Sequence, residues 1–132
     1  MTEDETSIRR LIADYALALD TGDVDACLAL FAADGEFVVY GRTFAGHEGI
    51  GQMFRDAPRG LHLTGVSRIE VGDDTATARS QVLFVRAGDL HLRPAIYDDE
   101  LARVDGHWRF RRRRCQFVTS RGLCDSPEVA SP

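Results

Sequence analysis

The sequence predicts an α+β fold in which three N-terminal helices pack on a strongly curved antiparallel sheet. Apolar residues recur every three or four positions near the N-terminus, and they alternate with polar residues beyond residue 60. Because the helical and the strand periods occupy separate parts of the chain, helices and sheet are segregated, as in α+β proteins. A strongly curved sheet wrapped on helices leaves a cone-shaped barrel with an internal pocket.

Three segments indicate the helices. The first helix is expected over residues 7–19. Its apolar stripe consists of Ile8, Leu11, Ile12, Tyr15 and Leu19. Gly22 can take the left-handed conformation that ends this helix, and Asp23 can accept the exposed amide protons of the next one. The second helix is expected over residues 24–31, and the third over residues 47–55.

The strands are expected in the β-branched and alternating segments. A short strand is predicted over residues 36–40, which are rich in aromatic and β-branched side chains. Four longer strands follow, separated by turn residues such as Asp105-Gly106, which is typical of a hairpin. They are expected over residues 61–71, 75–86, 90–104 and 107–118. A single domain is therefore expected over residues 1–121, followed by a flexible C-terminal tail over residues 122–132.

The composition argues against several classes of protein. The formal net charge of −5 disfavours a nucleic-acid-binding protein, because phosphate binding relies on a basic surface. No apolar run is long enough to span a membrane, and the N-terminus is acidic where a signal peptide would be basic. We therefore expect a soluble, cytoplasmic protein without nucleic-acid or membrane partners. Its three cysteines lack metal-ligand spacing and are expected to be reduced thiols.

Asp20 and His62 are the candidate acid/base pair. Asp20 follows Ile12 and Ala16 at intervals of four, so its carboxylate flanks the buried face of the first helix. His62 lies on a strand from which it could point to the concave face of the sheet and partner that charge. An imidazole bonded to a carboxylate can remove a proton next to a carbonyl near neutral pH. The alternative is structural: Asp20 caps the helix junction, and His62 is an ordinary core or surface histidine.

Several aromatic residues are candidates for the wall of a pocket. Tyr15 lies on the main apolar face of the first helix, where it either packs in the core or polarises a substrate carbonyl. Tyr40 and Tyr97 either line a pocket or simply pack. Phe54 and Trp108 are expected in the core or in the pocket wall.

The four consecutive arginines at residues 111–114 are an exception in an acidic chain. Because side chains on a strand alternate between the two faces, this run cannot act as one basic patch. Pairing with Asp98, Asp99 and Glu100 on the neighbouring strand is the first interpretation, and binding of an anion is the alternative.

Four segments of the sequence resemble one protein family. They are residues 15–34, 44–50, 62–64 and 97–110. Together they are similar to the SnoaL-like branch of the nuclear transport factor 2-like superfamily, which has a cystatin-like fold. The resemblance implies a cone-shaped α+β barrel, in agreement with the order of elements predicted above.

The resemblance extends to scytalone dehydratase and ketosteroid isomerase, and it implies roles for single positions. Asp20 and His62 correspond to the aspartate and the first histidine of the dehydratases, whereas their second histidine falls near Arg93. The aspartate base of ketosteroid isomerase falls at Val39, which excludes isomerase chemistry by that residue. The oxyanion tyrosine of the isomerase corresponds to Tyr15.

The resemblance and the candidate pair predict a cofactor-independent acid/base lyase or isomerase of the dehydratase or cyclase type. Its substrate would be a hydrophobic cyclic carbonyl compound of polyketide or aromatic origin. His62 would act as general base and then acid, Asp20 would orient it, and Tyr15 or Tyr40 would donate a hydrogen bond to the enolate. The substrate-binding residues would be Tyr40, Phe54, Tyr97 and Trp108. No metal ion and no cofactor are expected.

The alternative is a non-catalytic protein that binds a small molecule, or a structural partner comparable to the small subunit of an aromatic-ring dioxygenase. The missing second histidine and the valine at position 39 favour this alternative. Under either hypothesis the resemblance implies a homodimer, because similar proteins pair through the open sheet.

Overall fold

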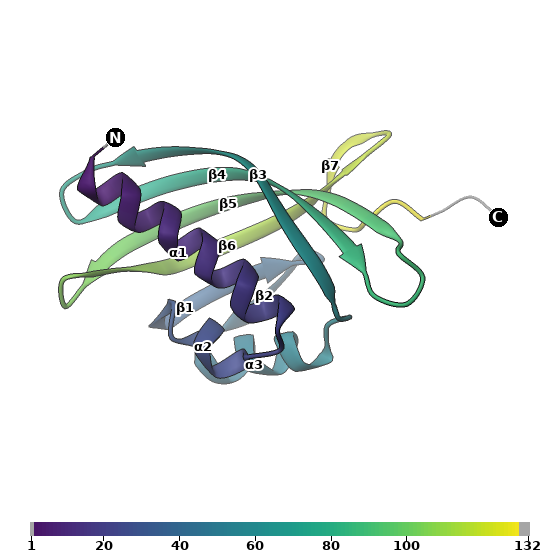
Figure 1. The fold of residues 1–132 in the computed structure, drawn as a ribbon, viewed down its shortest axis with the longest axis horizontal. Coiled ribbons are helices and arrows are strands. Elements are labelled where there is room, and N and C mark those ends of the chain that lie inside the picture. Colours follow the sequence, from purple (N-terminus) through teal and green to yellow (C-terminus); the bar gives the residue numbers. More distant parts are fainter. Residues whose placement is uncertain (1, 130–132) are drawn as a thin grey trace.

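Three helices and a seven-stranded sheet form the described part of the protein, residues 2–129 of a computed structural model (Figure 1). The α+β class predicted from the sequence is confirmed. The helices are α1 (Glu3–Asp20), α2 (Val24–Leu28) and α3 (Gly46–Asp56). The strands are β1 (Phe31–Val39), β2 (Arg42–Ala45), β3 (Gly60–Val71), β4 (Thr75–Arg86), β5 (Leu92–Val104), β6 (His107–Thr119) and β7 (Gly122–Cys124).

Helix α1 lies across one face of the sheet, and its sequence accounts for both of its ends (Figure 1). The Thr2 side chain accepts a hydrogen bond from the Glu5 amide at the N-terminal end. After the last turn, Gly22 takes a left-handed φ of 79°, and Asp23 caps α2 by accepting from the Ala26 amide. The predicted apolar stripe is buried at Ile8, Leu11, Ile12 and Tyr15.

Helix α2 is shorter than the predicted segment 24–31, whereas α3 agrees with its prediction. The chain leaves α2 after Leu28, because the Leu30 carbonyl accepts a hydrogen bond from the Phe110 amide and Phe31 already pairs in the sheet. Strand β1 therefore begins well before the short strand predicted over residues 36–40.

The strands follow the order β2-β1-β6-β5-β4-β3, and β7 pairs with β6. The four long strands β3 to β6 are consecutive antiparallel neighbours, as predicted. Strand β1, however, runs parallel to β6, so the sheet is mostly rather than wholly antiparallel. The sheet is curled, with β2 and β3 left as its two edges. The sheet is therefore an open curl rather than the expected barrel. Helix α3 connects the edge strands β2 and β3 along the chain, but these two strands are not hydrogen-bonded to each other.

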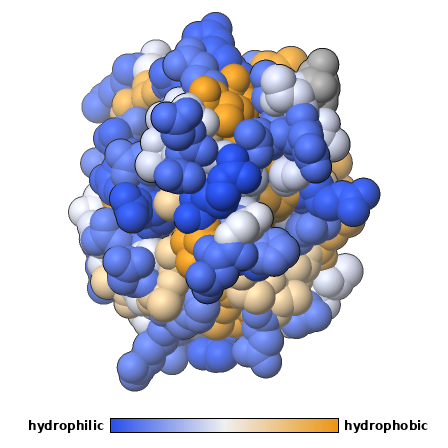
Figure 2. All heavy atoms as spheres, turned by 90° about the vertical axis from the view of Figure 1, so that its left-hand side faces the viewer, coloured by the Kyte–Doolittle hydropathy of each residue, from blue (hydrophilic) through white to orange (hydrophobic). Residues whose placement is uncertain are grey.

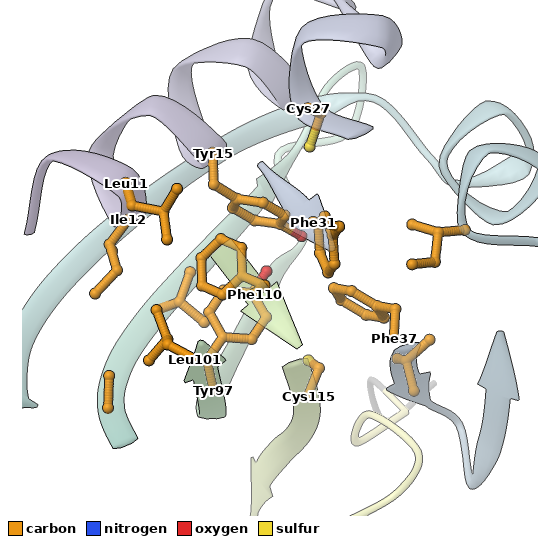
Figure 3. Close-up of a cluster of buried hydrophobic side chains, with 14 of the residues drawn as sticks. Leu11, Ile12, Tyr15, Cys27, Phe31, Phe37, Tyr97, Leu101, Phe110 and Cys115 are labelled. Carbon is orange, nitrogen blue, oxygen red and sulfur yellow. The ribbon is translucent and has the colours of Figure 1, made fainter. Parts of the chain in front are cut away.

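A cluster of aromatic rings fills the space between the helices and the sheet (Figure 3). The ring of Tyr15 on α1 lies at its centre, with centroid distances between 5.8 and 6.5 Å to five other rings. These rings belong to Phe31, Phe37, Phe54, Tyr97 and Phe110. Ring packing of this kind, edge to face with all but Phe37, adds to the gain from burial, so the cluster fixes α1 over the curl of the sheet.

The end of the molecule where α1 begins is covered mainly by hydrophilic side chains (Figure 2). Trp108 lies beside this start of α1, where its indole N–H donates to Asp4 at 3.1 Å. The Arg103 guanidinium covers the indole ring at 4.7 Å from its centroid. This tryptophan therefore ties β6 to the N-terminus of the helix.

The segment expected to be a tail, residues 122–132, begins with strand β7, which pairs with the end of β6. Residues 130–132 of that segment lie outside the described residues. No helix within residues 2–129 combines the length and the apolar character needed to cross a bilayer.

Candidate active site

A cavity of about 320 Å³ lies between the C-terminal end of α1, helix α3 and the inner face of the sheet. Its inner wall is part of the aromatic cluster and consists of Tyr15, Phe37, Phe54 and Tyr97. Further apolar lining comes from Val39, Val82, Phe84, Ala95 and Phe117. The polar side chains are few, and His62 on β3 is one of them. A mostly apolar cavity with a few polar groups is the usual form of a small-molecule site.

Asp20 holds His62 at the wall of this cavity through two hydrogen bonds. The Nδ1 atom of His62 lies 2.6 Å from Oδ1 of Asp20, and the backbone amide of His62 donates to Oδ2 at 2.9 Å. Only 14% of the His62 side chain and 12% of the Asp20 side chain are exposed. The last residue of α1 is thus fastened to the beginning of β3, and the catalytic interpretation of the pair is compatible with the fold.

The carboxylate decides which nitrogen of His62 is basic. Because a carboxylate can only accept, Nδ1 carries the proton, and the lone pair is left on Nε2. Burial lowers the pKa of the His62 imidazole, and the hydrogen bond and charge of Asp20 offset this only in part. The ring also packs against Phe84, with the centroids 4.7 Å apart. His62 is therefore a neutral, oriented base at neutral pH.

Acidification is expected to destabilise the protein through His62. Because the pKa of His62 is lower in the folded than in the unfolded state, the unfolded chain binds more protons below about pH 6.5. The contribution of His62 to the free energy of unfolding should therefore fall as the pH drops through that value. Asp99, whose folded pKa is raised to about 6, contributes with the opposite sign, both in the unmodified protein and in His62→Gln. Urea unfolding at neutral and at mildly acidic pH would measure the loss, which should be smaller in His62→Gln. An identical pH dependence in both proteins would contradict this assignment.

Tyr15 and Tyr97 form the floor of the cavity, and their rings pack edge to face with the centroids 5.8 Å apart. Burial raises the pKa of both phenols well above the usual value, so both keep their protons. A protonated phenol in an apolar cavity is a hydrogen-bond donor for a developing negative charge. Cys115 also lines the cavity, and burial raises the pKa of its thiol to about 12, which makes it a poor nucleophile.

A buried ion pair lies directly behind this floor. The Nε and Nη2 atoms of Arg113 donate to the two carboxylate oxygens of Asp99 at 2.8 and 3.2 Å. The guanidinium carbon lies 3.9 Å from the ring centroid of Tyr97, 4.3 Å from that of Tyr15 and 4.5 Å from that of Phe110. Burial raises the pKa of the Asp99 carboxyl to about 6, although Arg113 opposes this. The cross-strand pairing predicted for residues 111–114 is confirmed at this position.

The structure brings together most of the residues selected from the sequence. The cavity is lined by His62, Tyr15, Tyr40, Phe54 and Tyr97, and Asp20 lies behind His62. The prediction of Trp108 as a substrate-binding residue is wrong: it lies next to Asp4 at the start of α1. The sequence places Trp108 at the beginning of β6, but it does not show that the cavity lies toward the other end of that strand.

Three arginines that were not among the predicted site residues also line the cavity: Arg55, Arg59 and Arg93, the last of which the resemblance places near the second histidine of the dehydratases. A signal for one of them was present in the sequence. Arg93, Ala95 and Tyr97 alternate along β5 and therefore share one face of the strand. Since Tyr97 was a candidate for the pocket wall, the period of two could have placed Arg93 there as well.

Comparison with known proteins places this geometry in a family. The model of the SnoaL-like domain matches residues 1–114. A cystatin-like protein of unknown function from Nostoc punctiforme superposes with a TM-score of 0.83 at 28% identity, covering 91% of this chain and 95% of that chain. An NTF2-like protein from Novosphingobium aromaticivorans has a TM-score of 0.81 at 29% identity, with coverage of 89% and 84%. The hexachlorocyclohexane dehydrochlorinase LinA-type3 from Novosphingobium barchaimii has a TM-score of 0.77 at 21% identity, with coverage of 98% and 95%. No curated protein sequence matches the chain.

Proposed function

Because the chain belongs to the SnoaL-like domain family, we propose that its cavity performs proton-transfer chemistry on a small hydrophobic molecule. The reaction would be a lyase or isomerase reaction that needs no cofactor, on a cyclic carbonyl compound of polyketide or aromatic type. The observation that carries the proposal is the bond of 2.6 Å between Asp20 and Nδ1 of His62 at the wall of an apolar cavity. This bond leaves Nε2 as the basic atom.

The proposed reaction begins with proton abstraction by His62. Nε2 takes a proton from the carbon next to a substrate carbonyl, and the electron pair moves onto the carbonyl oxygen to form an enolate. Asp20 stabilises the imidazolium that results. Tyr15 from the floor or Tyr40 from the mouth donates a hydrogen bond to the enolate oxygen.

The second half of the reaction returns the proton from Nε2. In an elimination the enolate expels a hydroxyl group from the next carbon, and the imidazolium protonates it to release water. In an isomerisation the imidazolium instead delivers the proton to another carbon of the conjugated system. Both routes restore neutral His62, so one pair of residues serves both reaction classes.

Elimination is also the chemistry named in one structural relative. The dehydrochlorinase LinA-type3 is, by its name, an enzyme that removes hydrogen chloride from hexachlorocyclohexane. At 21% identity that likeness supports the fold, so the reaction proposed for this chain rests on its own cavity and its own Asp20–His62 pair.

Binding without turnover is the second candidate function. Arg93 stands near the position where the resemblance places the second histidine of the dehydratases, and Val39 lines the cavity at the position of the isomerase base. A cavity with one base and no second acid can hold a ligand without transforming it. The dioxygenase small-subunit interpretation belongs to this candidate.

Hydrogen exchange in heavy water tests the proposal without knowledge of the substrate. A panel of hydrophobic cyclic ketones and β-hydroxy ketones would be incubated with the protein in D₂O and followed by NMR. We expect deuterium to enter next to the carbonyl, or water to be lost, in at least one compound. Compounds that raise the melting temperature but show neither exchange nor elimination would contradict the enzyme proposal and support binding without turnover.

A further inference from the structure

Three arginines from three separate segments line the catalytic cavity. Arg55 comes from the last turn of α3, Arg59 from the connection to β3, and Arg93 from the beginning of β5. They accompany Tyr40, the residue that follows β1, which is 44% exposed. A positive rim therefore surrounds an apolar interior, in a chain whose formal net charge is −5.

These three arginines have no carboxylate partner among residues 2–129. Four other arginines do have one, namely Arg79, Arg86, Arg103 and Arg113. Arg93 makes a long contact from Nη1 to the Tyr40 hydroxyl at 3.5 Å, and its buried Nε has no hydrogen-bond partner in the described structure. A buried donor without a partner costs free energy, and a ligand oxygen could supply the missing acceptor.

Glycines make room for the other two guanidinium groups. A Cβ at Gly22 would lie 2.7 Å from Nη2 of Arg59, and a Cβ at Gly51 would lie 3.2 Å from Nη1 of Arg55. Each guanidinium group thus lies against a glycine, where no side chain occupies the space. Any larger residue at Gly22 would have to displace Arg59 from its place.

No carboxylate is among the residues that line the cavity within the described part of the chain. Asp20 lies behind His62, where each of its oxygens accepts a hydrogen bond from that residue. The cavity therefore has unpaired positive charge at its polar positions and aromatic rings at its floor. Such a distribution fits a ligand that is apolar at one end and anionic at the other.

We propose that the substrate is an amphipathic anion: a hydrophobic ring compound bearing a carboxylate or phosphate group, which Arg93, with Arg59 and Arg55, binds at the mouth of the cavity. This inference rests on the proposed function, whose substrate class it narrows. Arginine suits the role because its planar fork of N–H donors binds two oxygens of one acidic group. With the acidic group held at the rim, the ring extends inward toward His62 and the tyrosine floor.

Equilibrium binding of matched naphthalene compounds tests this charge preference. The ligands are 2-naphthoate, 2-naphthyl phosphate and the neutral methyl 2-naphthoate, measured by titration calorimetry. We expect at least one anion to bind about tenfold to a hundredfold more tightly than the neutral ester, as for a hydrogen bond to a charged group. The tighter of the two anions identifies the acidic group. Equal affinity for all three compounds would overturn the proposal.

The arginine variants separate charge recognition from general packing. Arg93→Gln, and Arg59→Gln as a second variant, should lower the affinity for the anion toward that for the ester. The affinity for the ester should stay the same. Arg111→Gln, an exposed arginine on β6, is the matched control and should change neither. An equal loss for anion and ester in both cavity variants would contradict direct binding of the acidic group.

The two proposals fail in distinguishable ways, because binding needs no turnover. His62→Gln should keep the preference for the anion. A preference for anions in a protein that exchanges no deuterium would uphold the anion site and refute the enzyme proposal. Equal kcat/KM values for charged and neutral forms of one substrate would uphold the enzyme and refute the anion site.

Discussion

Replacing His62 by glutamine is expected to lower kcat/KM for the proposed reaction by about 10²- to 10⁴-fold, the usual contribution of a positioned acid/base group. Glutamine has no basic nitrogen, so the proton next to the carbonyl would have no acceptor in the cavity. The fold should persist, since the backbone amide of residue 62 still donates to Asp20. Deuterium exchange into a confirmed substrate would measure the loss, with thermal unfolding as the check on folding.

Two companion variants sharpen this test. Asp20→Asn keeps an acceptor for the amide of residue 62 but removes the charge that stabilises the imidazolium, so an intermediate loss is expected. His107→Gln is the matched control, because His107 is exposed and lines a depression beside the start of α1 that shares no residue with the cavity. Unchanged rates in both His62→Gln and Asp20→Asn would remove the pair from the mechanism.

Replacing Arg113 by methionine is expected to lower the free energy of unfolding by about 3–5 kcal/mol, the usual cost of breaking a buried ion pair from one side. Asp99 would remain buried without its two hydrogen bonds, and three aromatic rings would lose the guanidinium between them. Proton uptake by Asp99, whose pKa is already raised to about 6, limits the penalty to this range. Equilibrium urea unfolding at neutral pH measures the change.

The neighbouring pair of residues supplies the control. Arg112 lies opposite Glu100 in the same two strands, where it is half-buried and Glu100 is exposed. Arg112→Met should therefore change the free energy of unfolding by less than about 1 kcal/mol, because neither side chain of this pair is fully buried. In Arg113→Met combined with Asp99→Leu, much of the lost stability should return, because no charge is then left buried. If Arg112→Met and Arg113→Met lowered the free energy of unfolding equally, the prediction that the Arg113–Asp99 ion pair dominates this loss would be wrong.

The fold could be predicted wherever the relevant contacts are close in sequence. The stripe of α1, the turn at Gly22 and the hairpin at Asp105-Gly106 depend on neighbouring residues, and the structure has them as predicted. The end of α2 and the beginning of β1 depend instead on Phe110, which is far along the chain. A periodicity argument cannot detect that contact. It therefore extended the helix to residue 31 and missed the parallel pairing with β6.

The site was predictable in part for the same reason. The spacing of Asp20 on its helix, together with the resemblance, selected the pair that the structure places 2.6 Å apart. Tyr40 and Trp108 were equally plausible as pocket residues, and the structure places them near opposite ends of the molecule. Which end of a strand faces the cavity is a property of the whole sheet, so single-residue chemistry could not separate them.

The hydrogen bond from the His62 amide to Asp20 also closes one position on an open edge of the sheet. Strand β3 is an edge of the sheet, and an unpaired edge amide invites pairing with another polypeptide. The Oδ2 atom of Asp20 accepts from one such amide, that of His62, so this position of the edge is closed to pairing with another strand. An acceptor at the end of α1 therefore has a structural role that does not depend on the proposed reaction. An aspartate at position 20 in a related protein is therefore evidence for catalysis only where a histidine is also present at position 62.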